Sequence, residues 1–170
     1  MATRAGSVQS DEATTVMIAL RRIVRFLRLA DREVEAACDL SAAQLFVLHV
    51  LVERPAASLS EIAARTLTDQ SSVSTVVARL VARGLVKRTS SKTDRRRAEL
   101  RITPAGQRMV DRAPRVPQAP MVAALRALPP AKQADLARAL DLLATVFGAN
   151  DVAPRMLFED EPPARRPRKR

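Results

Sequence analysis

The side chains best suited to chemistry in this sequence are hydroxyls, amides and arginines rather than catalytic groups. A polar run carries Gln70, Ser71, Ser74 and Thr75, which share one face if the run is helical. Hydroxyl and amide groups can donate hydrogen bonds to exposed base edges and accept hydrogen bonds from them. Arg79 follows on the same face with a long cation. The run therefore predicts close approach to the groove of a nucleic-acid duplex.

Positive charge is concentrated directly after this run. The segment 79–101 holds nine Lys or Arg residues against two acidic ones, a net charge of +7 out of +11 for the chain of 170 residues. Such a surface attracts phosphate, so nucleic acid is the first partner predicted and anionic lipid the second. Arginines at a loop tip suit the minor groove, where negative potential is concentrated.

The candidate DNA contacts fall into three groups. Helix starts and cations suit phosphate oxygens, because backbone amides and the helix dipole both favour an anion there. The full set is Gln70, Ser71, Ser72, Ser74, Thr75 and Arg79 for base edges, Ser58, Ser60 and Arg88 for phosphate, and Lys92, Arg95, Arg96 and Arg97 for the loop.

Catalytic and metal-binding chemistry has no comparable support. Cys38 is the only cysteine and His49 the only histidine, so no cluster has the spacing of metal ligands. We therefore expect no metal, no cofactor and no enzymatic activity. Apolar stretches are too short to cross a bilayer and no signal peptide is recognisable, so we expect no membrane partner and a cytoplasmic location.

Helical periodicity dominates the elements that must position these side chains. An amphipathic helix is expected over 11–37, and capping patterns at Ser41, Ser58 and Asp69 predict three further helices, the last ending at Gly84. Alternation then predicts strands over 85–89 and 96–103 around a polar loop.

The remaining third of the chain is predicted to be helical and then disordered. Thr103 and Pro104 start a helix that the prolines at 114, 117 and 120 interrupt, segment 121–128 resumes it, and a last helix ends near Gly148. The proline-rich, charged segment 149–170 is expected to be a disordered basic tail, and residues 1–10 a flexible N-terminus.

The predicted fold is therefore mainly α with a small two-stranded β wing. Residues 38–103 would form a winged helix-turn-helix lobe, in which the second helix of the pair enters the major groove. Segments 11–37 and 104–148 would supply N- and C-terminal dimerisation helices.

Several short runs in this order resemble the MarR family of bacterial transcription regulators. They are the sequences Leu59-Ser60-Glu61-Ile62-Ala63, Asp69-Gln70-Ser71-Ser72-Val73-Ser74, Arg83-Gly84-Leu85-Val86-Lys87-Arg88, Asp94-Arg95-Arg96-Arg97 and Ile102-Thr103-Pro104-Ala105-Gly106. The match is good over about 40–106. Leu67 departs from it, because the family usually has a glycine at that turn, and the proline cluster falls where the family has a continuous helix.

The resemblance implies a homodimer that reads a pseudo-palindromic operator on double-stranded DNA. It assigns Asp94 to orienting a wing arginine through an ion pair and Arg96 to the minor groove. It also implies a small-molecule effector, often an aromatic anion, bound between the dimerisation helices and the lobe. The resulting hypothesis is a ligand-responsive, sequence-specific repressor. The alternative is a winged-helix module that binds DNA without sequence preference or binds an acidic protein.

Overall fold

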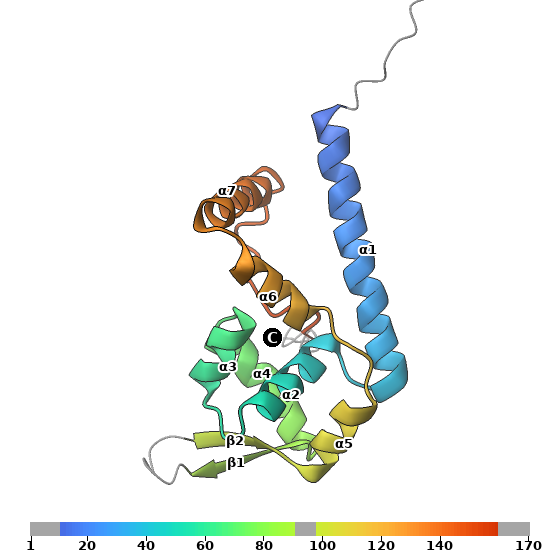
Figure 1. Cartoon of the computed structure of the whole chain (residues 1–170), viewed down its shortest axis with the longest axis vertical. Helices are drawn as coiled ribbons and strands as arrows, with labels where there is room; N and C mark the ends of the chain where they lie inside the picture. The colour runs from blue at the N-terminus through green and yellow to red at the C-terminus, as the bar shows by residue number, and fades with distance from the viewer. Residues whose placement is uncertain (1–10, 91–97, 160–170) are drawn as a thin grey trace, which may run out of the picture.

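The computed structural model describes residues 11–90 and 98–159, and within them the chain forms seven helices and one two-stranded sheet (Figure 1). The elements are α1 (Glu12–Cys38), α2 (Ala42–Glu53), α3 (Leu59–Thr66), α4 (Gln70–Ala82), β1 (Val86–Ser90), β2 (Ala98–Ile102), α5 (Pro104–Arg112), α6 (Gln118–Ala127) and α7 (Pro130–Val146). The mainly helical fold with a β hairpin confirms the predicted fold class.

Helix α2 is the centre of the lobe. It contacts α1, α3, α4, α5, α6 and β2, and its side chains from Ala42 to Leu48 are all buried. Leu45, Leu48 and Leu51 are fully enclosed. Burial on every side explains why this helix is apolar all round rather than striped. The core that it organises is almost wholly aliphatic, as the scarcity of aromatic residues requires.

Side-chain caps fix the starts of the helices that carry the candidate site. The Ser41 hydroxyl accepts from the Gln44 amide while the Gln44 side chain accepts from the Ser41 amide, and Ser58 and Glu61 repeat this arrangement at α3. Asp69 caps α4 by accepting from two backbone amides. All three predicted caps are confirmed, because each depends only on residues within one helical turn.

The turn between α3 and α4 keeps a left-handed residue although no glycine is present. Leu67 has φ 53° and ψ 44°, and the Thr68 amide donates to the Ala63 carbonyl at 3.0 Å. The leucine thus adopts the backbone conformation that favours glycine. The Leu67 side chain is 55% exposed, so little packing of this side chain offsets the backbone strain of the left-handed conformation.

The β hairpin is held to the lobe at the outer edge of β2 and closed at its own base. Strands β1 and β2 pair antiparallel with Val86 opposite Ile102, and Ala57 bridges Leu100 through bonds of 3.2 and 2.8 Å. At its base the Thr103 amide donates to the Leu85 carbonyl at 3.0 Å. Gly106 lies against this carbonyl, where a Cβ would come within 2.3 Å of the oxygen.

The proline cluster breaks the helix at one place rather than three. Helix α5 ends at Arg112, and α6 begins at Gln118 directly after Pro117. Pro120 lies inside the first turn of α6, so the prediction that it interrupts the helix is wrong. A proline is tolerated there because first-turn amides have no partner within the helix.

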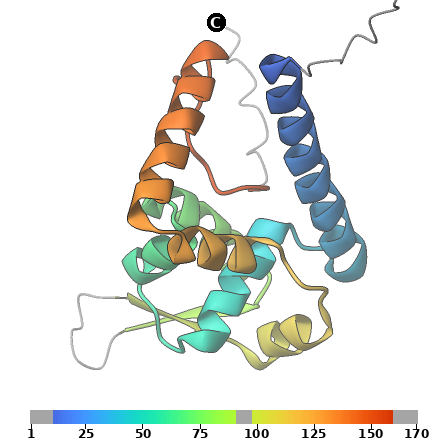
Figure 2. The same cartoon turned by 45° about the horizontal axis from the view of Figure 1, so that its top comes forward.

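Helices α1 and α7 extend away from the lobe, on the side opposite the hairpin (Figures 1 and 2). Only Leu27, Val34 and Cys38 of α1 are buried, and no residue of α7 is buried. In the part of the chain described, no single helix is long and apolar enough to cross a membrane, while α1 and α2 together pass that test of composition with a 74° bend between them.

The segment after α7 departs from the prediction of a disordered tail over 149–170. Residues 149–159 are described, and Met156 among them is 5% exposed and belongs to the hydrophobic core of the lobe. Residues 160–170, which include the basic cluster, lie outside the described part of the chain.

Candidate nucleic-acid interface

Helix α4 has one buried apolar side and one polar side. Val73, Val76, Val77 and Leu80 are at most 1% exposed and pack into the core. Because 3.6 residues make a turn, the polar side chains between them are directed outward. Gln70 and Ser71 are exposed, and Ser74, Thr75 and Arg79 are partly exposed. These five predicted base-contacting residues lie together on a single helix.

Ser72 does not share that surface. Its side chain is 4% exposed and lies among the buried residues of α4. In the folded single chain this hydroxyl is therefore not presented with the exposed polar side chains, and its predicted base contact stays a prediction. In an unbroken polar run the helical phase alone separates Ser72 from Ser71.

The N-cap of α4 determines which hydrogen-bonding groups the helix offers. The Asp69 carboxylate accepts from the backbone amides of Ser71 at 2.8 Å and Ser72 at 3.0 Å, and also from the Ser71 hydroxyl. These bonds, led by the one from the Ser71 hydroxyl, hold the pKa of Asp69 well below its ordinary value. Thr75 donates its hydroxyl proton to the Ser71 carbonyl at 3.1 Å. With both protons engaged, the two hydroxyls present acceptor lone pairs outward.

The start of α3 already carries an anion of the protein itself. The Glu61 carboxylate accepts from the amide and the hydroxyl of Ser58, each at 2.7 Å, and the hydroxyls of Ser58 and Ser60 lie 3.0 Å apart. The backbone hydrogen bond from Ser58 is the main cause of a lowered pKa at Glu61. Both predicted phosphate-binding serines thus meet at one helix start, beside a carboxylate.

Part of the basic hairpin belongs to the described structure. Lys87 and Arg88 are exposed on β1, and Arg101 on β2 pairs with Glu99 at 2.9 Å. The predicted wing residues Lys92, Asp94, Arg95, Arg96 and Arg97 lie outside the described residues.

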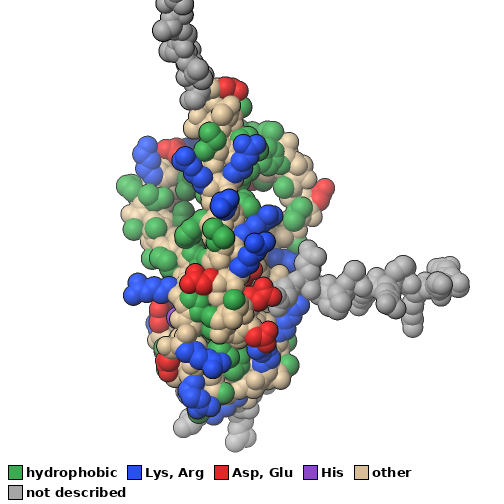
Figure 3. Space-filling model, turned by 90° about the vertical axis from the view of Figure 1, so that its right-hand side faces the viewer, with side chains coloured by type: hydrophobic (Ala, Val, Ile, Leu, Met, Phe, Trp, Pro, Cys, Tyr) green, Lys and Arg blue, Asp and Glu red, His purple; other side chains and the backbone are tan. Residues whose placement is uncertain are grey.

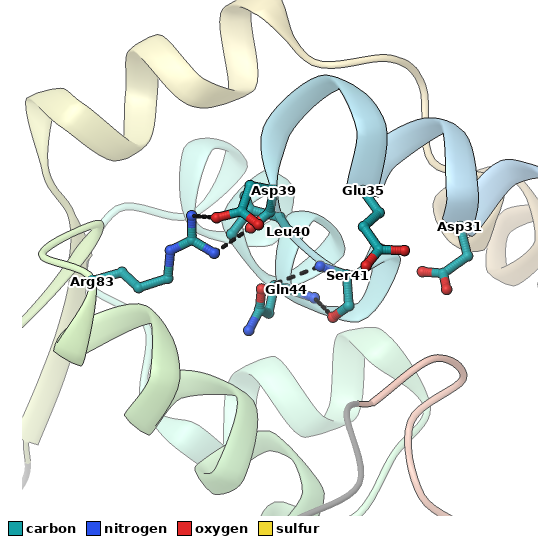
Figure 4. Close-up of a pocket in the computed structure, with 7 residues that line it drawn as sticks. All are labelled: Asp31, Glu35, Asp39, Leu40, Ser41, Gln44 and Arg83. Carbon is teal, nitrogen blue, oxygen red and sulfur yellow. Dashed lines mark hydrogen bonds and ion pairs between the residues drawn. The ribbon is translucent and has the colours of Figure 1, made fainter.

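An ion pair that the sequence does not reveal joins the end of α4 to the corner between α1 and α2 (Figure 4). Arg83 donates to the Asp39 carbonyl and also contacts its carboxylate at 2.9 Å. Next to this pair, the Ala42 amide donates to the Asp31 carboxylate at 2.8 Å. The partners Asp39 and Arg83 are 44 residues apart and match no motif, so no local pattern could have identified them.

A cavity of about 310 Å³ lies between α2, α3 and α6. Its apolar wall includes Phe46 and Val122, and its polar groups include His49, Arg65 and Arg126. The Nε2 atom of His49 is enclosed and has no hydrogen-bond partner within residues 11–90 and 98–159, and burial lowers the pKa of this side chain while nearby Glu53 opposes that effect. Among the described residues, no group of three or more His, Cys, Asp or Glu could hold a metal ion.

Residues 39–97 match the sequence model described as MarR family. This range contains α2, α3, α4 and β1, which carry the predicted base and phosphate contacts. No curated protein matches the chain.

Solved structures of transcription regulators are similar over most of the chain. PcaV from Streptomyces coelicolor, in complex with its natural ligand, is 26% identical with a TM-score of 0.52, and the match covers 86% of this chain and 99% of PcaV. BpsR from Bordetella bronchiseptica, whose DNA binding 6-hydroxynicotinic acid regulates, is 25% identical with a TM-score of 0.53, covering 85% and 97%.

A third similar structure is FabT from Streptococcus pneumoniae in complex with DNA. It is 17% identical with a TM-score of 0.54, and the match covers 81% of this chain and 98% of FabT. At this identity the likeness shows the fold alone. All three structures are matched almost completely, so a part of this chain has no counterpart in them.

Proposed function

We propose that this chain is a member of the MarR family and a sequence-specific DNA-binding transcription repressor. The observation that carries the proposal is the polar side of α4, where Gln70, Ser71, Ser74 and Thr75 are outward beside a basic hairpin. A helix of this width fits the major groove, and base-edge hydrogen bonds there distinguish all four base pairs. The predicted wing arginines 95–97 would then reach the flanking minor groove.

The described hydroxyls favour a particular kind of base contact. Ser71 and Thr75 both donate their protons within the protein, so each offers a lone pair outward. In the major groove the donors that can meet such acceptors are the amino groups of adenine and cytosine. Gln70 can both donate and accept, and adenine is its favoured bidentate partner.

Operator binding by a homodimer is the second part of the proposal. Large apolar side chains are uncovered on α1 and α7, which both project from the lobe; Figure 3 faces α1 and displays hydrophobic side chains around it with arginines between them. On α1 these are Val16, Met17, Ile18, Ile23, Val24, Phe26 and Leu29, and on α7 and its C-cap they are Leu136, Leu140, Leu142, Val146 and Phe147. An apolar surface shared by two helices is typical of a subunit interface. A second copy would cover it and place two α4 helices toward one operator.

The cavity between α2, α3 and α6 is the candidate effector site. Arg126 and Arg65 supply positive charge, and Phe46 and Val122 supply an apolar wall. Of the two arginines, Arg65 pairs with Glu53 in the same wall at 3.5 Å. That combination suits a small organic anion. PcaV is described in complex with its natural ligand and BpsR as regulated by 6-hydroxynicotinic acid, which supports an effector for this chain as well. Because α3 leads directly into α4, a ligand held there could change the spacing of the recognition helices.

Alanine substitutions on the polar side of α4 test the DNA-binding proposal. A duplex recovered by selection from random DNA should bind Gln70→Ala and Thr75→Ala about 5 to 100 times more weakly than the parent, since a good base contact is worth about 1 to 3 kcal/mol. Arg25→Gln, on exposed α1, is the matched control and should leave affinity unchanged. Equal affinity for parent and both α4 variants would remove α4 from the interface.

Competition with random duplex separates this function from the alternative. A specific regulator exceeds its own nonspecific affinity by about 10³ or more. A nonspecific winged-helix module would instead bind the selected duplex no better than random duplex, so the competitor would displace it fully. A module that binds an acidic protein would bind neither duplex.

A further inference from the structure

The chain turns back toward the lobe after α7. Helix α7 ends at Val146, Gly148 adopts a left-handed φ of +66°, and the Ala149 amide donates to the Ala144 carbonyl at 2.8 Å. Figure 2 shows the segment after α7 running back along that helix to the lobe. We name residues 153–159 the strap.

Apolar side chains anchor the strap to the lobe. Met156 is 5% exposed and belongs to the same buried cluster as the lobe residues, and Phe158 packs against that cluster. On one side the strap lines a groove of about 290 Å³ together with Leu67 and Thr68 of the turn before α4. The strap is therefore packed on the helix-turn-helix itself.

The other side of the strap faces the start of the recognition helix. A groove of about 520 Å³ separates the two. It is lined by Asp69, Ser71, Ser72 and Thr75 from the α4 side and by Ala153, Pro154, Arg155 and Glu159 from the strap. Ser71 and Thr75 are two of the proposed base-contacting residues, and they line the same groove as the chain's own C-terminal segment.

Glu159 brings a carboxylate to this side of the strap, where Arg155 also lies. Its Oε2 atom is enclosed and has no hydrogen-bond partner among the described residues. The next two residues in the sequence, Asp160 and Glu161, are also acidic. A carboxylate near the N-terminal end of a helix is favoured by the helix dipole, and DNA phosphate is attracted to the same place.

We propose that the strap is an intramolecular competitor that covers the start of α4 and must move before a duplex binds. The major groove is about 12 Å wide and admits one helix, so α4 cannot enter it with a second segment standing across a narrow groove from its first turn. The inference rests on the proposed DNA-binding function and adds a closed state to it. Only the fraction of molecules with the strap released binds DNA, which weakens the apparent affinity by that fraction.

Substitutions that detach the strap test this directly. Met156→Ser and, separately, Phe158→Ser should raise the affinity of the full-length chain for a selected duplex about tenfold or more at about 150 mM salt. Phe158 is only partly buried, so its substitution keeps the test valid if the Met156 variant fails to fold. The matched control is Val152→Ser, because Val152 lies just before the strap, is 69% exposed and should leave affinity unchanged.

Cleavage of the parent chain by trypsin gives a second readout that needs no substitution. Arg155 lies within the strap and is exposed, but a protease needs the surrounding backbone to open. Adding the selected duplex should therefore accelerate cleavage after Arg155. Slower or unchanged cleavage would contradict displacement of the strap.

The outcomes separate this inference from the function on which it rests. Tighter DNA binding by both strap variants than by the parent supports the proposal that the strap competes with DNA. Equal, measurable DNA binding by the parent and both variants overturns the proposed competition by the strap and leaves the DNA-binding proposal intact. Absence of binding by every chain overturns both.

Discussion

At the scale of single residues, the candidate interface depends on a few groups whose conformation or protonation is constrained. Leu67 holds a left-handed backbone that leucine rarely adopts, and it does so next to the N-cap Asp69. Its exposure shows that packing of the side chain does not impose this conformation. The turn is instead enforced by the helices on either side, which are both anchored in the core.

Replacing Leu67 with glycine should stabilise the protein by up to about 1 kcal/mol, because glycine adopts the left-handed region without strain. Chemical denaturation would measure the change in free energy of unfolding. Leu67→Ala is the control, since alanine retains a Cβ and should give no such gain. A loss of more than about 1 kcal/mol in the glycine variant would mean that the leucine side chain is important for packing.

Burial of His49 predicts a loss of stability in weak acid. Its pKa is lowered from the ordinary value of 6.5, so the unfolded chain binds a proton more readily than the folded one. Stability should therefore fall as the pH drops below about 6.5. Glu61 and Asp69, whose pKa values are also lowered, lose their contribution only near and below pH 4.

Thermal unfolding of the parent and of His49→Gln at pH 7.5 and 5.5 would measure this effect. The glutamine variant does not titrate there and should lose less stability between the two values. An equal decrease in both proteins would assign the pH dependence to other groups.

At the scale of helices and strands, local patterns predicted most of the fold and part of the site. The caps at Ser41, Ser58 and Asp69 were predictable because each bond joins residues within four positions. The burial of Ser72 was not predicted, because Ser71 and Ser72 carry the same hydroxyl group and are both candidates for base contacts in the sequence. The pair Arg83 and Asp39 was also hidden, since only tertiary structure brings it together.

The close packing of α5 on the hairpin gives a sharp prediction at this scale. Gly106→Ala would place a Cβ 2.3 Å from the Leu85 carbonyl oxygen and 2.8 Å from the Ile102 side chain. Backbone has to move to relieve such a contact, so we expect a loss of about 2 kcal/mol or more. Ala105→Ser, at the exposed neighbouring position, should change stability by less than about 0.5 kcal/mol. Denaturant titration of both variants makes the comparison, and equal stability would contradict the packing.

At the scale of the whole molecule, sequence periodicity identified α1 and α7 as amphipathic but could not reveal what covers them. In the single chain their apolar side chains remain largely exposed. The return of Met156 to the core was equally hidden, because the surrounding segment has the proline and charge content of a disordered tail. Long-range packing decides both features, and no window of the sequence contains it.

A charged substitution on α1 should dissociate the proposed dimer. Phe26 is 56% exposed, and Phe26→Asp would place a carboxylate within an apolar interface at a high desolvation cost. Analytical ultracentrifugation should find the parent at twice the mass of the chain and the variant shifted toward the single-chain mass. Arg25→Gln, at the neighbouring exposed position, should remain dimeric. A parent that sediments as a monomer at micromolar concentration would exclude the dimer.

Selection of bound duplexes from a random DNA pool by the full-length chain tests the central claim most directly. Two α4 helices in one dimer should enrich a pseudo-palindrome whose half-sites are about 10 to 11 base pairs apart, or a multiple of that spacing. A pool that shows no enriched motif after repeated rounds, while the protein still binds duplex, would contradict sequence-specific recognition by α4.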